Sequence, residues 1–371
     1  MAAPLLPAVL QPSDVMSIVG ALQAGERLPR GVVAELLQRQ IALLREQRNV
    51  LRVELKPAQR ITVVGDLHGQ LADLMHIFSI AGWPSKDSLF LFNGDFVDRG
   101  PKSVQVVLIL FAWHQCFPDA VLLNRGNHEE STVNAVYGFL ADCAAMYDKQ
   151  IYDMFDEAFR WLPLASLIDS RTLVLHAGVA TGLTINMLDE LPRAKYTMED
   201  KNKPDAAKAP HFNRVIETVL WSDPQPKKGC VANKKRGAGC RFGPDVVQEF
   251  MAREGLGLIV RSHECVMDGT PLPRRSRAAD GAPGEMIAPP FHPPHPATPP
   301  SPSTQTFSPP TLLTLPTIPS HTTPPTPVHP PRARGDGSQL AQPSPSVQLR
   351  KPFIARPLRF PKRFLLGVGR Y

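Results

Sequence analysis

Apolar and polar residues alternate along this chain with two different periods. Near the amino terminus, apolar residues recur every three to four positions in residues 13–22 and 30–47. That spacing places them on one face of an α-helix. We expect two amphipathic helices packed on the core, the first capped by Ser13 or Asp14. A basic helix of the calmodulin-binding type is the alternative interpretation of this region.

Short β-rich runs then alternate with amphipathic helical segments. The expected strands are residues 61–64, 88–92 and 120–124, and the expected helices between them are residues 71–81 and 103–116. This alternation predicts a parallel sheet with right-handed crossovers. Further along, we expect a helical stretch, a strand, a Lys-rich surface loop and a last strand, at residues 132–160, 171–178, 194–212 and 255–262.

The composition changes abruptly at Thr270. Of the 40 prolines in the 371 residues, 25 lie in residues 271–371, together with twelve basic and only three acidic residues. Proline interrupts helices and sheet ladders, so this segment is expected to be a disordered or polyproline-II basic tail. The first 270 residues hold 29 basic and 31 acidic residues, so the net charge of +7 belongs to the tail. Charge therefore does not indicate a nucleic-acid partner for the folded part.

Other features limit the class of protein. No uncharged apolar run reaches the ~20 residues that cross a bilayer, so no membrane partner is expected. The start of the chain lacks the basic region of a signal peptide. Five scattered cysteines do not indicate a disulfide framework. Cys230 and Cys240 could share a zinc ion, but the sequence contains no CxxC pair of the kind that usually binds zinc. We expect free thiols and a cytoplasmic or nuclear location, or both.

Each of the first three expected strands ends in a polar motif. GDLHG follows residues 61–64, GDFVDRG follows 88–92, and RGNHE follows 120–124. The carboxyl ends of parallel strands meet at one edge of a sheet, so these motifs should lie close together. Two later strands end on His176 and His263. A lone histidine is more often a satisfied core residue than a ligand, but five polar strand ends in one chain favour a common site.

The residue types indicate a metal site. Six candidate ligands carry imidazole, carboxylate or amide groups and no thiolate: Asp66, His68, Asp95, Asn127, His176 and His263. This set suits Zn²⁺, Fe or Mn²⁺. Six ligands are too many for one catalytic ion that must keep a water, and they suit two ions that share a carboxylate and activate water for phosphoryl transfer.

The motif series GDLHG, GDFVDRG, GNHE, HAG, WSDP and RSHE resembles the PPP family of protein serine/threonine phosphatases over residues 13–269. Residues 227–247 and 261–265 resemble its EF-hand-containing branch of the retinal degeneration C type. The resemblance implies a calcineurin-like metallophosphoesterase fold of the α/β class, a β-sandwich flanked by helices in αββα order. It also implies three regions: an N-terminal helical segment at 1–55, a catalytic domain at 56–269 and the disordered Pro-rich tail at 270–371.

The resemblance further implies a role for each site residue. It assigns a first metal to Asp66, His68 and Asp95, and a second metal to Asp95, Asn127, His176 and His263. It assigns His128 as the acid that protonates the leaving serine or threonine oxygen, with Asp98 as its orienting partner. Phosphate oxygens would be bound by Arg99, Arg236 and Asn127. Asp223 would either shape the site or form a structural turn.

The resemblance stops at Thr270. The final strands of the family fold and the EF-hands of the branch have no counterpart in residues 270–371. We therefore expect a carboxyl-terminally incomplete catalytic domain with an exposed sheet edge. The main hypothesis is hydrolysis of phosphoserine and phosphothreonine in phosphoprotein substrates. The alternatives are a catalytically impaired metal-binding pseudo-phosphatase or interaction protein and, less favoured, a nucleotide or dinucleoside polyphosphate hydrolase. PATP at 296–299 and PTIP at 316–319 could bind an SH3 or WW module.

Overall fold

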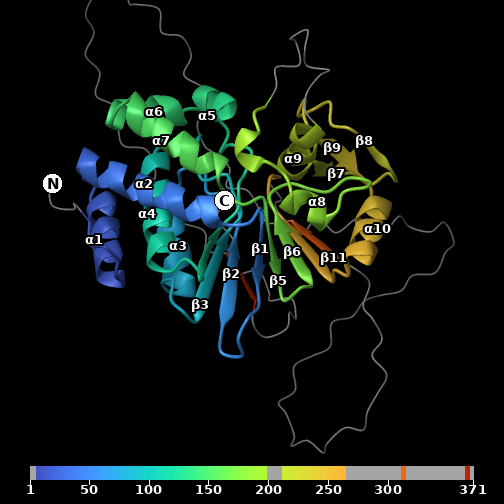
Figure 1. Ribbon diagram of the computed structural model, residues 1–371, viewed down its shortest axis with the longest axis horizontal. Helices are drawn as coiled ribbons and strands as arrows, with labels where there is room; N and C mark the ends of the chain where they lie inside the picture. Colours follow the sequence, from blue (N-terminus) through green and yellow to red (C-terminus); the bar gives the residue numbers. More distant parts are fainter. Residues whose placement is uncertain (1–5, 199–210, 265–310, 315–363, 368–371) are drawn as a thin grey trace, which may run out of the picture.

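Two β-sheets pack face to face, with helices covering both outer sides (Figure 1). The computed structural model describes residues 6–198, 211–264, 311–314 and 364–367. The first sheet has the order β1 (Val50–Val53), β5 (Ala165–Ile168), β6 (Thr172–Leu175), β10 (Leu258–Arg261) and β11 (Thr311–Thr314). The second has the order β12 (Phe364–Gly367), β2 (Arg60–Val64), β3 (Ser88–Phe92) and β4 (Val121–Leu123). The expected αββα architecture is confirmed.

Helices form the outer layers. Those on the side of the second sheet, which share one apolar cluster with it, are α1 (Pro12–Gln23), α2 (Arg30–Glu46), α3 (Leu71–Ala81), α4 (Ser103–Cys116), α6 (Phe139–Met146) and α7 (Lys149–Arg160). Those packed on the first sheet are α8 (Ile185–Asp189), α9 (His211–Trp221) and α10 (Pro244–Glu254). A small sheet of β7 (Asp223–Pro224), β9 (Cys240–Phe242) and β8 (Cys230–Ala232) lies beside α9 and α10 (Figure 1). The described helices include none that is both long and apolar enough to span a membrane.

The apolar strands are buried on both faces, with a period of two. Ile61, Val63 and Leu91 face the opposite sheet, in the cluster that includes Val174 and Val260. Their neighbours Val64, Phe90 and Phe92 face the helices instead. This explains why the parallel strands are continuous apolar runs rather than alternating ones.

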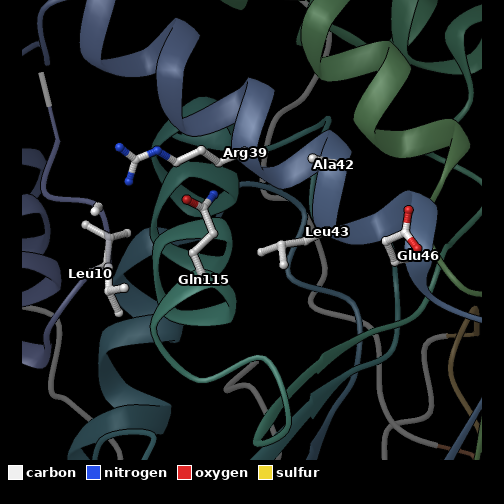
Figure 2. A pocket seen from close by; sticks show the side chains of 8 residues that line it. Leu10, Arg39, Ala42, Leu43, Glu46 and Gln115 are labelled. Carbon is white, nitrogen blue, oxygen red and sulfur yellow. The ribbon is translucent and has the colours of Figure 1, made fainter. Parts of the chain in front are cut away.

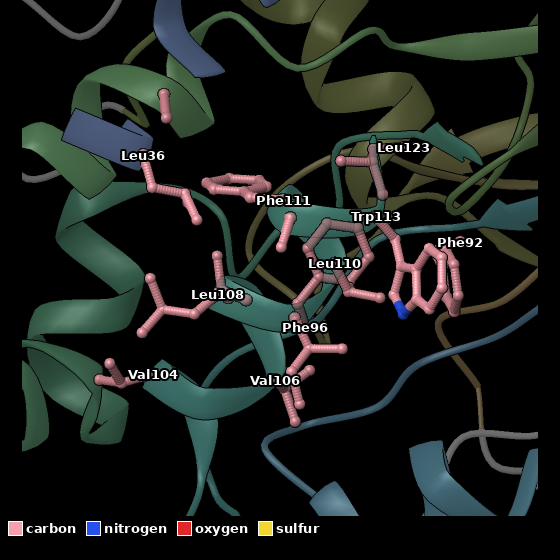
Figure 3. Close-up of a cluster of buried hydrophobic side chains, with 14 of the residues drawn as sticks. Leu36, Phe92, Phe96, Val104, Val106, Leu108, Leu110, Phe111, Trp113 and Leu123 are labelled. Carbon is pink, nitrogen blue, oxygen red and sulfur yellow. The ribbon is translucent and has the colours of Figure 1, made fainter. Parts of the chain in front are cut away.

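Helix α4 differs from the expectation of an amphipathic helix. Every residue from Ser103 to His114 is buried, because α1, α2 and α6 pack against it from outside the sheet. Its apolar side chains extend in all directions into a cluster that includes Leu36, Phe92 and Leu123 (Figure 3). It is the central helix of its layer, so it needs no polar face.

The helical stretch expected at residues 132–160 is three helices rather than one. The first, α5 (Ser131–Tyr137), ends at Gly138, whose φ of +126° cannot continue a helix. Helix α7 restarts behind Asp148, whose side chain accepts the N–H of Ile151 at 2.9 Å.

Several elements were not expected from the sequence. β1 lies in the expected N-terminal helical segment at 1–55, after the second of its two expected helices, and it pairs in parallel with β5. β5 in turn forms an antiparallel pair with β6, so the first sheet is mixed. These strands have only four residues each, too few to establish a clear period.

The expectation of an exposed sheet edge is wrong at two places. β11 pairs with β10, and β12 pairs with β2, both in parallel. These segments are proline-free runs, TLLT and FLLG, inside the Pro-rich region, so their N–H groups are available for a ladder. The rest of the tail, with the PATP and PTIP segments, lies outside the described residues.

A groove of about 450 Å³ lies on the helical layer between α2, the carboxyl end of α4 and the segment before α1. Leu10, Ala42 and Leu43 give it an apolar lining, and Arg39 and Glu46 extend along α2 (Figure 2). Ser103, at the opposite end of α4, contacts the polar strand-end motifs. The two ends are about 18 Å apart at 1.5 Å per residue, so the groove is separate from the candidate site.

Prediction: His114 makes folding stability depend on pH. Both its ring nitrogens contact amides, Gln40 at 2.8 Å and Gln47 at 3.0 Å, and burial lowers the pKa of His114 to about 4. Because the folded pKa is below the unfolded value, the stability contribution is complete above pH ~6.5 and is lost as the pH falls towards 4. Relative to His114→Gln, the wild type should lose about 1.4 kcal/mol per pH unit in this window.

Urea unfolding followed by tryptophan fluorescence at pH 7.5, 6.0 and 5.0 measures this difference. Parallel declines of the wild type and His114→Gln would show that His114 does not titrate on unfolding.

Candidate active site

Five polar strand ends converge at one edge of the sandwich. Asp66, Asp95 and Asn127 follow β2, β3 and β4 of the second sheet, and His176 and His263 follow β6 and β10 of the first. All are buried. The backbone is strained here: among the described residues, the positive-φ positions other than glycine include His68, Asp95, Asp98, Arg99 and His263. Such strain concentrates at functional sites.

His68 has a free lone pair that faces carboxylates. Its Nδ1–H donates to the carbonyl of Val97 at 2.8 Å, so Nε2 is the unprotonated nitrogen. This buried atom has no hydrogen-bond partner among the described residues. It lies 3.9 Å from Asp66 Oδ2 and 3.7 Å from Asp95 Oδ2. Burial lowers the pKa of His68 to about 3, so the ring is neutral near pH 7. A cation between these three atoms would satisfy all of them.

A second group surrounds His176. Its Nδ1–H donates to the carbonyl of Asn93 at 2.9 Å, and its Nε2 lies 2.9 Å from Asn127 Oδ1 and 3.2 Å from His263 Nδ1. Burial lowers the pKa of His176, but the Asp95 carboxylate outweighs this and raises the pKa to about 9. The same potential that retains a proton attracts a metal cation. The burial of His263 lowers its pKa well below the usual value, leaving a neutral imidazole.

Asp95 lies between the two groups. Its Oδ2 is 3.7 Å from His68 Nε2 and 3.4 Å from His176 Nε2, while its Oδ1 accepts the N–H of His128 at 2.9 Å. Burial raises the pKa of Asp95, but His176 and His128 hold it well below its usual range. One ionised oxygen facing both groups suits a carboxylate shared by two cations. The donor set therefore fits a centre of two metal ions that share one carboxylate.

His128 is bonded to a carboxylate and lies next to a guanidinium, unlike the candidate metal ligands. It is spaced with His68 and Asp95 as a metal ligand could be, but its Nδ1 contacts Asp98 Oδ2 at 2.6 Å and its Nε2 lies 3.3 Å from Arg99 Nη2. A guanidinium next to the remaining nitrogen disfavours a metal ion there. Burial lowers the pKa of His128, but Asp95 and Asp98 outweigh it, and the pKa is raised.

Arg236 reaches the edge of the site through Asp223. Its Nε donates to Asp223 Oδ2 at 3.0 Å and its Nη2 to the carbonyl of His263 at 3.1 Å. Asp223 also accepts hydrogen bonds from Asn233 at 2.9 Å and from the buried Arg261 at 3.4 Å. Of the two roles that the sequence left open for Asp223, this geometry favours shaping the site.

The carboxylate of Glu129 joins the turns that follow β3 and β4. No role for this residue was predicted from the sequence. Its carboxylate accepts the N–H groups of Asp95 and Phe96 at 2.7 Å and of Gly126 at 2.9 Å. A methyl group on Gly126 would lie 2.3 Å from the nitrogen of Asp95, so the turns after β3 and β4 touch directly. The acid of the GNHE motif was the only sign of Glu129 in the sequence. A carboxylate whose partners are backbone N–H groups has no partner residue type that a single sequence could reveal.

A buried amide network was also missed. Asn93 Nδ2 donates to the carbonyl of Leu175 at 2.9 Å and to Ser262 Oγ at 3.0 Å. Asn124 Nδ2 donates to Asn93 Oδ1 at 2.9 Å, and Asn124 Oδ1 accepts from Ser166 Oγ at 2.8 Å. Asn93 and Asn124 follow strands of the second sheet, and the other three belong to the first, so the network joins the sheets below the site.

The sequence matches the family model of the calcineurin-like phosphoesterases over residues 59–267. Together with the two-sheet fold and the strand-end ligands, this shows that the chain belongs to the calcineurin-like phosphoesterase family. Homologues of the rdgC and phosphatase 5 types confirm the resemblance to protein serine/threonine phosphatases.

Two relatives illustrate the similarity. The serine/threonine-protein phosphatase rdgC of Drosophila melanogaster is 38% identical over 265 residues, which cover 69% of this chain and 40% of that protein. Serine/threonine-protein phosphatase 5 of Homo sapiens is 38% identical over 246 residues, covering 66% and 46%. This chain thus spans less than half the length of either relative.

A solved structure is also similar. It is a protein serine/threonine phosphatase from Saccharomyces cerevisiae with similarity to human phosphatase PP5. The match has a TM-score of 0.63 at 31% identity and covers 70% of this chain and 79% of that one.

Prediction: Glu129→Gln disrupts the site without changing its ligands. The amide of glutamine would point N–H groups at backbone N–H groups, which leaves buried donors unsatisfied at a cost of about 1–3 kcal/mol. Urea unfolding should show this loss, and metal analysis after Mn²⁺ loading should show fewer than two ions per chain. Exposed Glu26→Gln, which makes the same chemical change, should alter neither quantity. Unchanged stability and metal content in Glu129→Gln would mean that the turns do not need this carboxylate.

Proposed function

We propose that this chain hydrolyses phosphoserine and phosphothreonine esters in proteins at a two-metal site. The observation that carries the proposal is the position of Asp95 Oδ2, within 3.7 Å of His68 Nε2 and 3.4 Å of His176 Nε2. The relatives bear the name serine/threonine-protein phosphatase. Because the chain spans only part of their length, the activity and its substrates are taken from them as a proposal.

The residues that would hold the ions are Asp66, His68, Asp95, Asn127, His176 and His263. Imidazole, carboxylate and amide donors without thiolate suit Mn²⁺, Fe or Zn²⁺. Two such ions supply Lewis acidity towards the phosphoryl group and lower the pKa of water. The protein keeps the donors in place before a metal arrives: Val97 and Asn93 fix the rings of His68 and His176 through their Nδ1–H groups.

The remaining side chains would act on the phosphoester. Arg99, Arg236 and Asn127 bind phosphate oxygens, for which a planar guanidinium supplies paired donors. His128 donates a proton to the departing serine or threonine oxygen. Asp98 Oδ2 binds the other ring nitrogen, Nδ1, at 2.6 Å. The raised pKa of His128 keeps the ring protonated near pH 7.

Other parts of the proposal concern location and partners. The free thiols among the described cysteines (Cys116, Cys143, Cys230 and Cys240) are compatible with a reducing cytoplasmic or nuclear location. An SH3 or WW module remains the proposed partner of the PATP and PTIP segments.

Prediction: Asp95→Asn abolishes hydrolysis of a phosphoserine peptide. Loss of the charge between the two groups removes the shared ligand, so Mn²⁺-dependent turnover should fall to the level seen with excess chelator. Exposed Asp119→Asn should retain wild-type turnover. Full turnover in Asp95→Asn would contradict the mechanism, and a folded wild type that binds two metals without turnover would favour the pseudo-phosphatase.

Prediction: the effect of His128→Asn depends on the leaving group. A serine alkoxide leaves poorly and needs a proton, whereas p-nitrophenolate is stable without one. Peptide hydrolysis should fall by about 10²–10⁴, and p-nitrophenyl phosphate hydrolysis by much less, as measured by kcat at saturating Mn²⁺. Equal losses for both substrates would place His128 in substrate binding or structure instead.

A further inference from the structure

A hairpin next to the candidate site is strongly basic. Residues 227–241, here called the basic hairpin, contain six basic residues and no acidic one: Lys227, Lys228, Lys234, Lys235, Arg236 and Arg241. Its strands β8 and β9 pair antiparallel, with Ala232 opposite Cys240. All of its basic residues except the half-buried Arg236 are exposed.

The turn of this hairpin is fixed against the site. Asn233 Nδ2 donates to Asp223 Oδ2 at 2.9 Å, and the N–H of Gly237 donates to the carbonyl of Asn233 at 2.9 Å. Arg236 then bonds both Asp223 and the carbonyl of His263. Lys234 and Lys235 therefore have a defined position, because they directly precede a residue that touches a candidate metal ligand.

The described residues include no carboxylate that pairs with an exposed charge of the hairpin. Within the described part of the chain, Lys227, Lys228, Lys234, Lys235 and Arg241 form no ion pair. Many other surface bases do, as in the pairs Arg30–Asp148, Arg45–Glu157 and Lys149–Asp153. Asp245, the carboxylate just beyond the hairpin, instead accepts the backbone N–H of Gly229 at 2.9 Å. The positive field of the hairpin is thus directed to solvent beside the site.

We propose that the basic hairpin selects phosphoserine and phosphothreonine peptides with acidic residues next to the phosphorylated position. This inference rests on the proposed function and specifies its substrate class. Opposite charges at the rim of a site increase the association rate and the selectivity for one partner more than they increase the strength of each contact.

Distances support this selection. An extended peptide advances about 3.3–3.6 Å per residue, so the three residues on either side of a bound phosphoserine reach about 10 Å from it. Adjacent Cα atoms are 3.8 Å apart, and a lysine chain extends about 6 Å further. Lys234 and Lys235 can thus approach the flanking side chains while Arg236 contacts the phosphate. This is close to the ~8 Å range of charge interactions at physiological salt.

A single-stranded nucleic acid is the competing partner for positive charge. Such binding normally adds aromatic side chains on which bases stack, and residues 227–241 contain no aromatic residue. Because the hairpin lies next to a candidate phosphoester site, a phosphopeptide is favoured over a nucleic acid as its partner.

Three phosphoserine peptides of equal length, with glutamate, glutamine or lysine in the flanks, test the inference on the full chain with Mn²⁺. The variant is Lys234→Glu/Lys235→Glu. The control is Lys56→Glu/Lys86→Glu, which makes the same charge change at exposed positions that precede β2 and β3, at the opposite ends of these strands. Turnover of p-nitrophenyl phosphate, which has no flanks, checks that each site is intact.

The wild type and the control should have a kcat/KM for the acidic peptide on the order of tenfold above that for the neutral one, decreasing towards parity at ~1 M salt. The variant should lose or reverse this preference while p-nitrophenyl phosphate turnover changes less than about twofold. An unchanged preference in the variant, or an equal loss in the control, overturns the inference.

A measurement of peptide binding tests the role of the hairpin independently of catalytic activity. If no peptide is hydrolysed, the proposed function fails, and fluorescence anisotropy of the labelled phosphopeptides with the same three proteins still decides the role of the hairpin. Tighter binding of the acidic peptide that is lost only in Lys234→Glu/Lys235→Glu supports it. Tighter binding of a single-stranded oligonucleotide than of any peptide, lost in the same variant, overturns it in favour of a nucleic-acid partner.

Discussion

The relative position of the two sheets is the constraint on which the rest of the structure depends. Asp66, Asp95 and Asn127 come from one sheet and His176 and His263 from the other. A slip between the sheets would therefore move His176 Nε2 away from Asn127 Oδ1 and Asp95 Oδ2, which now lie 2.9 and 3.4 Å from it. Apolar packing between the sheets is non-directional and cannot prevent such a slip. The Asn93–Asn124 network adds a directional restraint, because the bonds from Asn93 to Leu175 and from Ser166 to Asn124 cross between the sheets and would be lost if the sheets moved.

Hydrogen bonds to Glu129 explain how a strained, charged cluster can exist in the core of this protein. Asp95 adopts a φ of +54°, which is unfavourable for a residue other than glycine, and its carboxylate is buried. Glu129 offsets the strain by accepting three N–H groups from the adjoining turns. The price is a second buried acid, and burial together with Asp95 raises the pKa of Glu129 to about 7. Metal cations would compensate this excess of negative charge, so folding stability and metal affinity are linked at this site.

The sequence predicted those parts of the fold that depend on local pattern. Strand ends carrying Asp66, Asp95 and Asn127 could be identified because apolar runs stop at polar motifs, and the parallel second sheet then brings them together. Burial of α4 on all sides could not be predicted, because it depends on where α1 and α2 pack. Glu129 was missed because its carboxylate accepts backbone N–H groups, which leave no pattern in the sequence. Asn93 was missed because its side-chain partners Asn124 and Ser262 are 31 and 169 residues away in the sequence.

Asp223 connects the basic hairpin to the strand ends that carry the candidate metal ligands. This carboxylate binds Arg236 and Asn233 of the hairpin on one side and Arg261 of β10 on the other, so the hairpin is attached to the strand ends without supplying a candidate metal ligand. Charges at exposed positions such as Lys234 can therefore change without moving any candidate metal ligand, whereas a change at Arg236 would affect Asp223 and His263 directly. On this physical basis, substitutions at the surface residues of the turn would change the proposed selection of phosphopeptides and leave the candidate metal ligands in place.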